Sequence, residues 1–253
     1  MMQTRYKAIA LFLITLFLLP PLISEAQGYA TEITPTSGRQ VEIEWIVKKA
    51  PSSPFQLFFS EGGFWNSTNN SRMFFTMINI TEDVMGELII GNATVTANDT
   101  MIARDLVLGV WGLTEWWPGL IIETDSTSIE DLNETAYAAA ARVSGNYQNG
   151  TMVSYYDNVT AGEAQYSCIV FEYVQDPTGY SVPQETYLAY SLETGILIKA
   201  NTSYSFGTPY LLELEYSGYR VWTSWGVLDY ALMAGIVILL AGVVIVIQRR
   251  MKK

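Results

Sequence analysis

The chain has no histidine and a single cysteine, and these two shortages exclude several classes of protein. Without histidine there is no Ser-His-Asp or Cys-His catalytic centre and no His-ligated zinc. A single cysteine cannot form an internal disulfide, which excludes a disulfide-dense extracellular scaffold. Cys168 lies in an apolar stretch, and we expect it to be a small buried side chain rather than a reactive thiol. Stability must therefore come from a packed core.

Motifs for nucleotides and metals are missing as well. The chain contains no Walker loop, no dinucleotide-binding glycine fingerprint and no calcium-binding EF-hand loop. The carboxylate pairs Glu82-Asp83 and Glu130-Asp131 are adjacent residues near turns or a helix start, which is typical of solvated or capping groups rather than of a glycosidase pair. The negative charge of the acidic loops would suit calcium, but their acidic residues do not have the spacing of a calcium-binding loop. We therefore predict a non-enzymatic protein with no catalytic residue, no cofactor and no metal site.

Basic residues are scarce except at the two ends of the chain. Residues 27–226 contain 8 Lys and Arg against 23 Asp and Glu, a net charge of −15. This charge makes nucleic acid and anionic lipid surfaces poor partners, so no nucleic-acid partner is predicted. Cations, basic proteins or simple solubility fit the charge better.

Apolar runs near both ends predict where the protein resides. Residues 230–247 carry no charge and are followed by a tail with four basic residues among the last five. Eighteen helical residues at ~1.5 Å each cover about 27 Å, close to a bilayer's hydrocarbon core, and the basic tail favours the cytoplasmic side. At the other end, Arg5 and Lys7 precede twelve apolar residues and the small-residue site Ser24-Glu25-Ala26, which is typical of a cleaved signal peptide. An uncleaved N-terminal anchor is the alternative.

Together these segments predict a type I single-pass protein of the cell membrane. Its parts are a signal peptide (1–26), an extracellular β-rich domain (27–226), a transmembrane helix (227–248) and a basic cytoplasmic tail (249–253). The lipid bilayer is then one partner, bound through the C-terminal helix. Only about a dozen residues separate the last predicted strand from the span, so the domain should sit close to the membrane, with Trp222 and Trp225 in the outer aromatic belt.

Asn-x-Ser/Thr sequons are abundant in the predicted extracellular part and absent from the signal peptide and the span. The nine candidates for glycosylation are Asn66, Asn69, Asn79, Asn92, Asn98, Asn133, Asn149, Asn158 and Asn201. We expect several of them to carry glycans, which would place them on the surface. The alternative is that a composition rich in Asn and Thr produces sequons by chance. Asn66 and Asn69 are too close together for us to expect both to be used.

Short alternating segments separated by turn residues predict an antiparallel β-sheet. The predicted strands are residues 41–47, 55–59, 73–80, 87–90, 94–97, 151–156, 166–174, 185–191, 196–204 and 210–216. Residues 64–71 are expected to be a loop and residues 157–163 a turn. Hairpins are expected around Gly91-Asn92 and at residues 192–195, where Gly195 would be the left-handed residue.

One helix is predicted, over residues 131–143. Ser128 with Asp131 resembles a capping box, Gly145 is a plausible stop, and residues 105–111 fit either a strand or a helix. The apolar face of the helix comprises Ile129, Leu132, Ala136, Ala139, Ala140 and Val143. The predicted fold class is therefore α+β: a curved antiparallel β-sheet with one packed helix, plus a C-terminal transmembrane helix. An all-β sandwich with residues 131–143 as a loop is the alternative.

Aromatic residues are concentrated in the N-terminal half. Most of them fit the core of a curved sheet, but an apolar pocket or an aromatic platform for sugars or lipids is the other interpretation. The candidate pocket residues are Trp111, Trp116, Trp117 and Phe74.

Several segments resemble known groups of proteins. Residues 73–81 (MFFTMINIT), 105–111 (DLVLGVW), 117–120 (WPGL) and 187–198 (YLAYSLETGILI) resemble uncharacterised archaeal cell-surface proteins of the choice-of-anchor type. That resemblance implies a signal peptide, a β-rich ectodomain, a C-terminal anchor and an envelope location, with no known activity. No Pro-Gly-Phe sorting signal precedes the span, so we expect the helix to be retained.

The Thr194-Gly195 hairpin is also similar to lipoprotein-carrier half-barrels of the LolA and LppX type, although the lipobox cysteine is missing. Those proteins pack a curved sheet on helices around an apolar cavity. The expected function is a membrane-anchored, non-enzymatic binding module for an apolar ligand, a carbohydrate or a partner protein. The alternative is a structural envelope glycoprotein without a small-molecule ligand.

Overall fold

The structure is a computed structural model of the chain. It describes residues 28–36, 38–52, 55–81, 83–111, 115–141, 149–177, 179, 181–205, 207, 209–223 and 235–236. The predicted signal peptide and cytoplasmic tail, and all of the predicted span except Gly235 and Ile236, lie outside these residues. Over the part that is described, no helix has the length and apolarity needed to cross a bilayer.

A nine-stranded antiparallel sheet forms the body of the domain. Its strands are β1 (Arg39–Lys49), β4 (Arg72–Ile80), β5 (Val84–Ile90), β6 (Ala93–Asn98), β7 (Gly150–Ala161), β8 (Ala164–Gln175), β9 (Val182–Ser191), β10 (Leu197–Ser205) and β11 (Pro209–Thr223). The spatial order is β6-β5-β4-β1-β11-β10-β9-β8-β7. The first and last strands therefore pair at the centre and join two meanders. Two short strands, β2 (Gln56–Phe58) and β3 (Phe64–Asn66), pair separately.

The alternation of apolar and polar residues explains why these segments form strands. In β1 every second residue, Val41, Ile43, Trp45 and Val47, is buried, while the intervening residues are partly exposed. Successive side chains of a strand point to opposite faces, so this pattern gives the sheet one apolar face. The indole of Trp45 also donates a hydrogen bond of 2.6 Å to the Leu197 carbonyl, which satisfies its one polar group inside the core.

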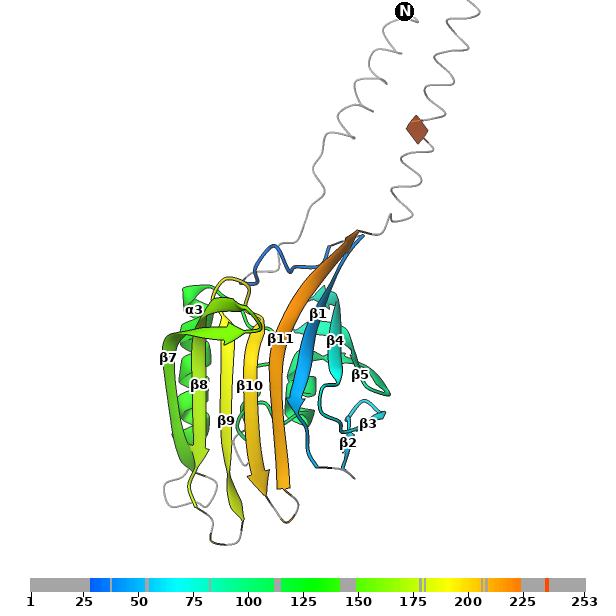
Figure 1. Cartoon of the computed structure of the whole chain (residues 1–253). Coiled ribbons are helices and arrows are strands. Elements are labelled where there is room, and N and C mark those ends of the chain that lie inside the picture. Colours follow the sequence, from blue (N-terminus) through cyan, green and yellow to red (C-terminus); the bar gives the residue numbers. More distant parts are fainter. Residues whose placement is uncertain are drawn as a thin grey trace, which may run out of the picture.

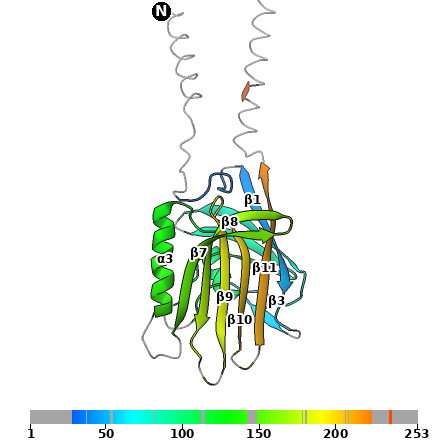
Figure 2. The same ribbon diagram turned by 60° about the vertical axis from the view of Figure 1, so that its left-hand side comes forward.

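The sheet is curved, and the helices lie on the side that it encloses. Figure 1 shows β4 and β5 turning behind β11, with helical segments behind the front strands, and Figure 2 shows α3 (Ser126–Ala141) running beside β7. Helix α3 buries Ile129, Ala136, Ala139 and Ala140. The Tyr137 hydroxyl accepts a hydrogen bond of 3.0 Å from the Ser154 amide of β7. The antiparallel sheet and the α+β class are confirmed.

The helix predictions need two corrections. Helix α3 begins at Ser126, five residues before the predicted start, because Asp125 rather than Ser128 caps it. Asp125 Oδ1 accepts hydrogen bonds from the amides of Thr127 at 3.0 Å and Ser128 at 3.1 Å. A second helix, α2 (Asp99–Asp105), was not predicted. Its seven residues are too few to show a helical period, and its clearest signal is the N-cap Asn98, which accepts a bond from Met101.

Three predictions of irregular or ambiguous structure were wrong. Residues 64–66 form strand β3 instead of part of a loop, because Trp65 is fully buried between two exposed neighbours. Strand β7 continues to Ala161, so the turn predicted at 157–163 is confined to its last two residues, Gly162, whose φ is +58°, and Glu163. Of residues 105–111, only Asp105 is helical, as the last residue of α2, and the rest are irregular apart from an isolated bridge between Val110 and Trp116.

Buried polar side chains hold the segment between α2 and α3 against the sheet. The Tyr190 hydroxyl donates to the Gly119 carbonyl at 2.8 Å, and the Tyr210 hydroxyl donates to the Leu106 carbonyl at 2.9 Å. Both rings are buried, so these bonds satisfy backbone groups that would otherwise lack water. These bonds position the described parts of the segment, and three of its residues, Val107, Trp111 and Glu115, line the site described next.

Candidate functional site

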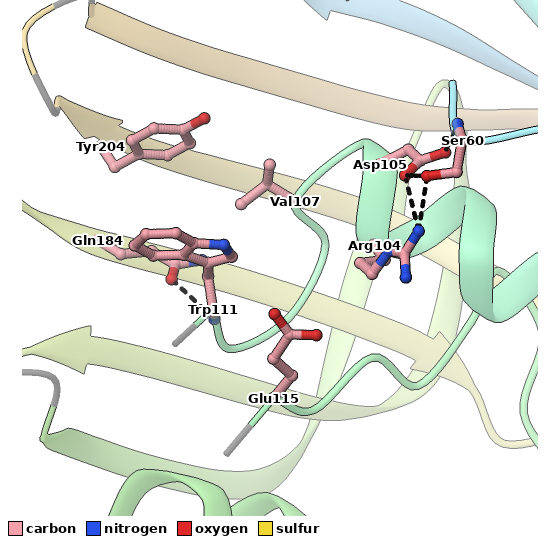
Figure 3. Close-up of a pocket in the computed structure, with 8 residues that line it drawn as sticks. All are labelled: Ser60, Arg104, Asp105, Val107, Trp111, Glu115, Gln184 and Tyr204. Atoms are coloured by element: carbon pink, nitrogen blue, oxygen red, sulfur yellow. Dashed lines mark hydrogen bonds and ion pairs between the residues drawn. The ribbon is translucent and has the colours of Figure 1, made fainter. Parts of the chain in front are cut away.

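A cavity of about 530 Å³ lies between the segment after α2 and strands β9 and β10 (Figure 3). This volume falls in the range of small-molecule sites, roughly 300–1,000 Å³. Its lining residues are Ser60, Arg104, Asp105, Val107, Trp111, Glu115, Gln184 and Tyr204. They come from the β2–β3 turn, the end of α2, the segment that follows it and two strands.

A charged cluster forms one end of the cavity. Asp105 accepts two hydrogen bonds of 2.7 Å from Ser60, one from its amide and one from its hydroxyl. Arg104 Nη2 donates to the Ser60 hydroxyl at 2.6 Å and lies 3.5 Å from Asp105 Oδ1. The cluster joins the β2–β3 turn to the end of α2, and the two opposite charges balance each other.

The C-terminus of α2 ends in a strained residue that lies in the cavity wall. The Leu108 amide donates to the Ala103 carbonyl at 2.8 Å and the Val107 amide to the Arg104 carbonyl at 2.9 Å, which is the Schellman pattern. In this pattern the residue at the position of Val107 is left-handed and usually glycine. Val107 has a φ of +59°, which costs a β-branched residue roughly 1–2 kcal/mol. The strain places an isopropyl group at the cavity wall, where glycine would leave none (Figure 3).

Gln184 forms the fixed floor of the site. Its side chain is almost fully buried on β9 and donates to the Gly109 carbonyl at 2.9 Å and to the Thr186 hydroxyl at 3.0 Å. Its Oε1 accepts a bond of 3.1 Å from the Trp111 amide. One amide side chain therefore sets the backbone position of the segment on which Trp111 stands.

Two aromatic rings and a carboxylate complete the lining. The Trp111 side chain is 41% exposed, a large fraction for an indole. Tyr204 on β10 is half-buried and stacks on Tyr210, with ring centroids 4.9 Å apart. Burial raises the pKa of Tyr204, so its ring is a neutral phenol near neutral pH. Glu115 is exposed, and its Oε2 accepts a bond of 3.1 Å from the Trp117 indole.

Of the four predicted pocket aromatics, only Trp111 lines this cavity. Trp116 is buried in the core, with its ring centroid 5.1 Å from that of Phe171. Trp117 is half-buried beside Glu115. Phe74 is on the face of β4 opposite the buried residues, with the Arg72 guanidinium 5.0 Å above its ring. Residues that the sequence did not single out, above all Gln184 and Tyr204, form the rest of the site.

A buried carboxylate lies behind the site and ties its segment to α2. Asp99 is 2% exposed, and its Oδ2 accepts bonds from the amides of Leu120 at 2.9 Å and Ile121 at 3.0 Å. Burial raises the pKa of Asp99 to about 7, although these backbone bonds act in the opposite direction. Gly119 is required beside it, since it has a φ of +93° and a Cβ there would lie 2.4 Å from Asp99 Oδ2.

The candidate glycosylation sites differ in their exposure. Six asparagines are exposed: Asn66, Asn69, Asn79, Asn92, Asn158 and Asn201. Asn133 is half-buried, and Asn98 is half-buried with its amide committed to capping α2 and to Asp83. Asn149 is 8% exposed. Glycosylation stays a prediction, and exposure favours these six sites, although Asn92 Nδ2 also donates to the Phe64 carbonyl at 3.1 Å.

The arrangement is suited to holding a small molecule between aromatic rings and charged groups on rigid supports. Trp111 and Tyr204 offer apolar surface, while Arg104 and Glu115 offer a donor and an acceptor. No family model, curated protein or solved structure matches this chain.

Proposed function

We propose that this chain is a membrane-anchored extracellular glycoprotein whose β-rich domain is a non-enzymatic binding module for a small ligand. The cavity of about 530 Å³ with Trp111 in its wall is the observation that supports this best. A domain that needed only a solid core would fill such a space with its own side chains at crystal-like density. Instead, a strained Val107 and a 41% exposed indole border an open volume.

The position of the last strand supports anchoring at the membrane. Strand β11 ends at Thr223, close in sequence to the predicted span at 227–248. Near its end, Tyr219, Val221 and Trp222 are 38–49% exposed, and Figure 1 shows β1 and β11 projecting beyond the neighbouring strands. Exposed aromatic and aliphatic side chains suit the headgroup region of a bilayer. We therefore place this end of the domain against the outer leaflet of the cell membrane.

A structural envelope glycoprotein is the second candidate, and the quality of the core favours it. Trp45, Trp65, Tyr173, Tyr190, Phe75 and Phe171 are all essentially inaccessible to solvent. A domain with so large a packed core is stable without a ligand. The relation to choice-of-anchor surface proteins and to LolA-type half-barrels stays a prediction in either case.

Native mass spectrometry of the intact protein from its own membranes tests the proposal. A reproducible small molecule that co-purifies with the wild type and is lost in Trp111→Ala supports the binding function. The matched control is Trp222→Ala, which removes an exposed tryptophan that does not line the cavity and should retain the ligand. A bare mass for freshly isolated wild-type protein, with no ligand recovered by organic extraction, would leave the structural candidate ahead.

A further inference from the structure

The chemistry of the cavity also indicates the class of ligand, on the assumption that the proposed binding function holds. Most polar groups of the lining are already committed to each other. Gln184 uses both N–H groups and accepts from the Trp111 amide, and both oxygens of Asp105 accept from Ser60. These groups shape the site and have little capacity left for a ligand.

Two polar groups retain that capacity. Arg104 has five N–H donors, and its Nη2 donates to Ser60 and lies 3.5 Å from Asp105 Oδ1, while its Nε and Nη1 make no hydrogen bond to a described residue. Glu115 Oε1 likewise has no donor among them, since the Trp117 indole reaches Oε2. In Figure 3 the Glu115 carboxylate points toward the space between Trp111 and Arg104. A donor and an acceptor of opposite charge therefore border the same volume.

These two groups disfavour three simple ligands. A hydrocarbon chain would take Arg104 and Glu115 out of water without hydrogen bonds, which is costly. An organic cation would be repelled by the guanidinium of Arg104, and an anion would be repelled by the carboxylates of Glu115 and Asp105. Hydroxyl groups fit both, because each one can donate to a carboxylate and accept from a guanidinium.

The aromatic walls add a second requirement. Figure 3 shows the rings of Trp111 and Tyr204 on the same side of the cavity, with Val107 beside them. They present apolar surface at one wall, while Arg104 and Glu115 lie at the border. A ligand that matches both has a flat apolar face and a rim of hydroxyls. We propose that the cavity binds a neutral saccharide of about two rings, with C–H faces against Trp111 and Tyr204 and hydroxyls on Arg104 and Glu115.

Titration calorimetry on the full-length protein in phospholipid nanodiscs, prepared without sugar-headed detergent, tests this assignment. The probes are maltose, cellobiose and N,N′-diacetylchitobiose, with choline and laurate as probes of the cationic and apolar alternatives. We expect one-to-one binding of at least one disaccharide with a Kd at or below about 1 mM. Because the ligand is neutral, the Kd should change less than about twofold as salt screens surface charge.

Variants locate the ligand in this cavity. Trp111→Ala should weaken disaccharide binding by about tenfold, as truncation of a central tryptophan does, whereas the control Trp222→Ala should leave it unchanged. Glu115→Gln keeps an acceptor and should bind within about threefold of the wild type, while Glu115→Ala should bind more weakly still. Glu115 is exposed, so these two variants keep the test decisive if Trp111→Ala folds poorly.

The alternative outcomes separate the two proposals. Binding of choline that Glu115→Gln abolishes, or binding of laurate that Trp111→Ala abolishes, would overturn the saccharide and leave the binding function standing. Disaccharide binding that neither Trp111→Ala nor Glu115→Ala changes would place the sugar elsewhere and also overturn the assignment. If no probe binds and no ligand co-purifies with the wild type, both proposals fail.

Discussion

Replacing Asp99 by asparagine should change how the stability of the domain depends on pH. Asp99 is buried, and its pKa is raised from 3.8 to about 7, with desolvation as the largest cause. Bonds from the amides of Ile121, Leu120 and Thr100 lower the pKa, and the nearby charge of Asp83 raises it slightly. The raised pKa means that burial outweighs the three backbone donors.

The sign and size of the effect follow from proton linkage. The folded state holds the proton of Asp99 more tightly than the unfolded state does. The contribution of this proton to the free energy of unfolding is therefore fully present below pH 3.8 and is lost as the pH rises to about 7. At 1.36 kcal/mol per pKa unit, the loss is on the order of 4 kcal/mol. The carboxamide of the Asp99→Asn variant would not titrate and would still offer an oxygen to the amides of Leu120 and Ile121. The free energy of unfolding of Asp99→Asn minus that of the wild type should therefore rise with pH between about 4 and 7, and level off above.

The assay is urea unfolding of the full-length protein in nanodiscs, followed by tryptophan fluorescence at several pH values from about 4 to 8. Asp131→Asn is the control, because it makes the same change in charge at an exposed position of α3. Its difference from the wild type should stay within about 0.5 kcal/mol across the range. If the Asp99→Asn difference is also flat, Asp99 is already ionised at pH 4 and the three backbone donors, rather than burial, set its pKa. That result would refute the reasoning.

Four further outcomes are expected. Val107→Gly removes the cost of roughly 1–2 kcal/mol of a left-handed valine, but it also removes side-chain contacts and makes the unfolded chain more flexible. Its free energy of unfolding in urea should therefore lie within about 1 kcal/mol of the wild type, while ligand binding weakens. Gly119→Ala combines a positive φ with a contact to Asp99 and should lower the unfolding free energy by more than about 2 kcal/mol. Peptide mapping should find glycans among the six exposed sequons and none at Asn149, and a glycan on Asn149 would contradict the burial argument. Protease applied to intact cells should remove nearly everything except the membrane span, and a protected β-rich domain would overturn the topology.

The strands could be predicted from the sequence because alternation is a local property. Strand β1 shows it in the printed sequence, and the structure buries the alternating apolar residues. The hairpin at residue 195 was also predictable, because a short connection between two strands needs a left-handed residue, and Gly195 has a φ of +73°. Helix α3 was predicted from its alanines, but its start depended on whether Asp125 or Ser128 accepted the first amides. Either residue is a good cap, so composition alone could not decide.

The order of the strands could not be predicted. The central pair joins β1 with β11, which lie at opposite ends of the domain in sequence, with Ile43 opposite Tyr219. Pairing between strands so far apart in sequence depends on how the two meanders pack on a common core, and the sequence of no single segment indicates it. The same limit applies to the site. Trp111 was singled out because it is aromatic. Gln184 looks like an ordinary polar strand residue in the sequence, and only the fold shows that its side chain donates to the Gly109 carbonyl.

Four buried side chains hold the described parts of the segment between α2 and α3, residues 106–111 and 115–121. Tyr210, Gln184, Tyr190 and Asp99 are all buried, and each uses its polar group on the backbone of this one segment. The backbone groups that they contact are buried, and each one left unpaired would cost roughly 1–3 kcal/mol. The bonds fix the backbone on both sides of Trp111 and hold Val107 in a conformation that it would otherwise avoid. Rigid support of an exposed indole beside an open volume is what the proposed binding site would require, because a preorganised site loses less conformational freedom when its ligand binds.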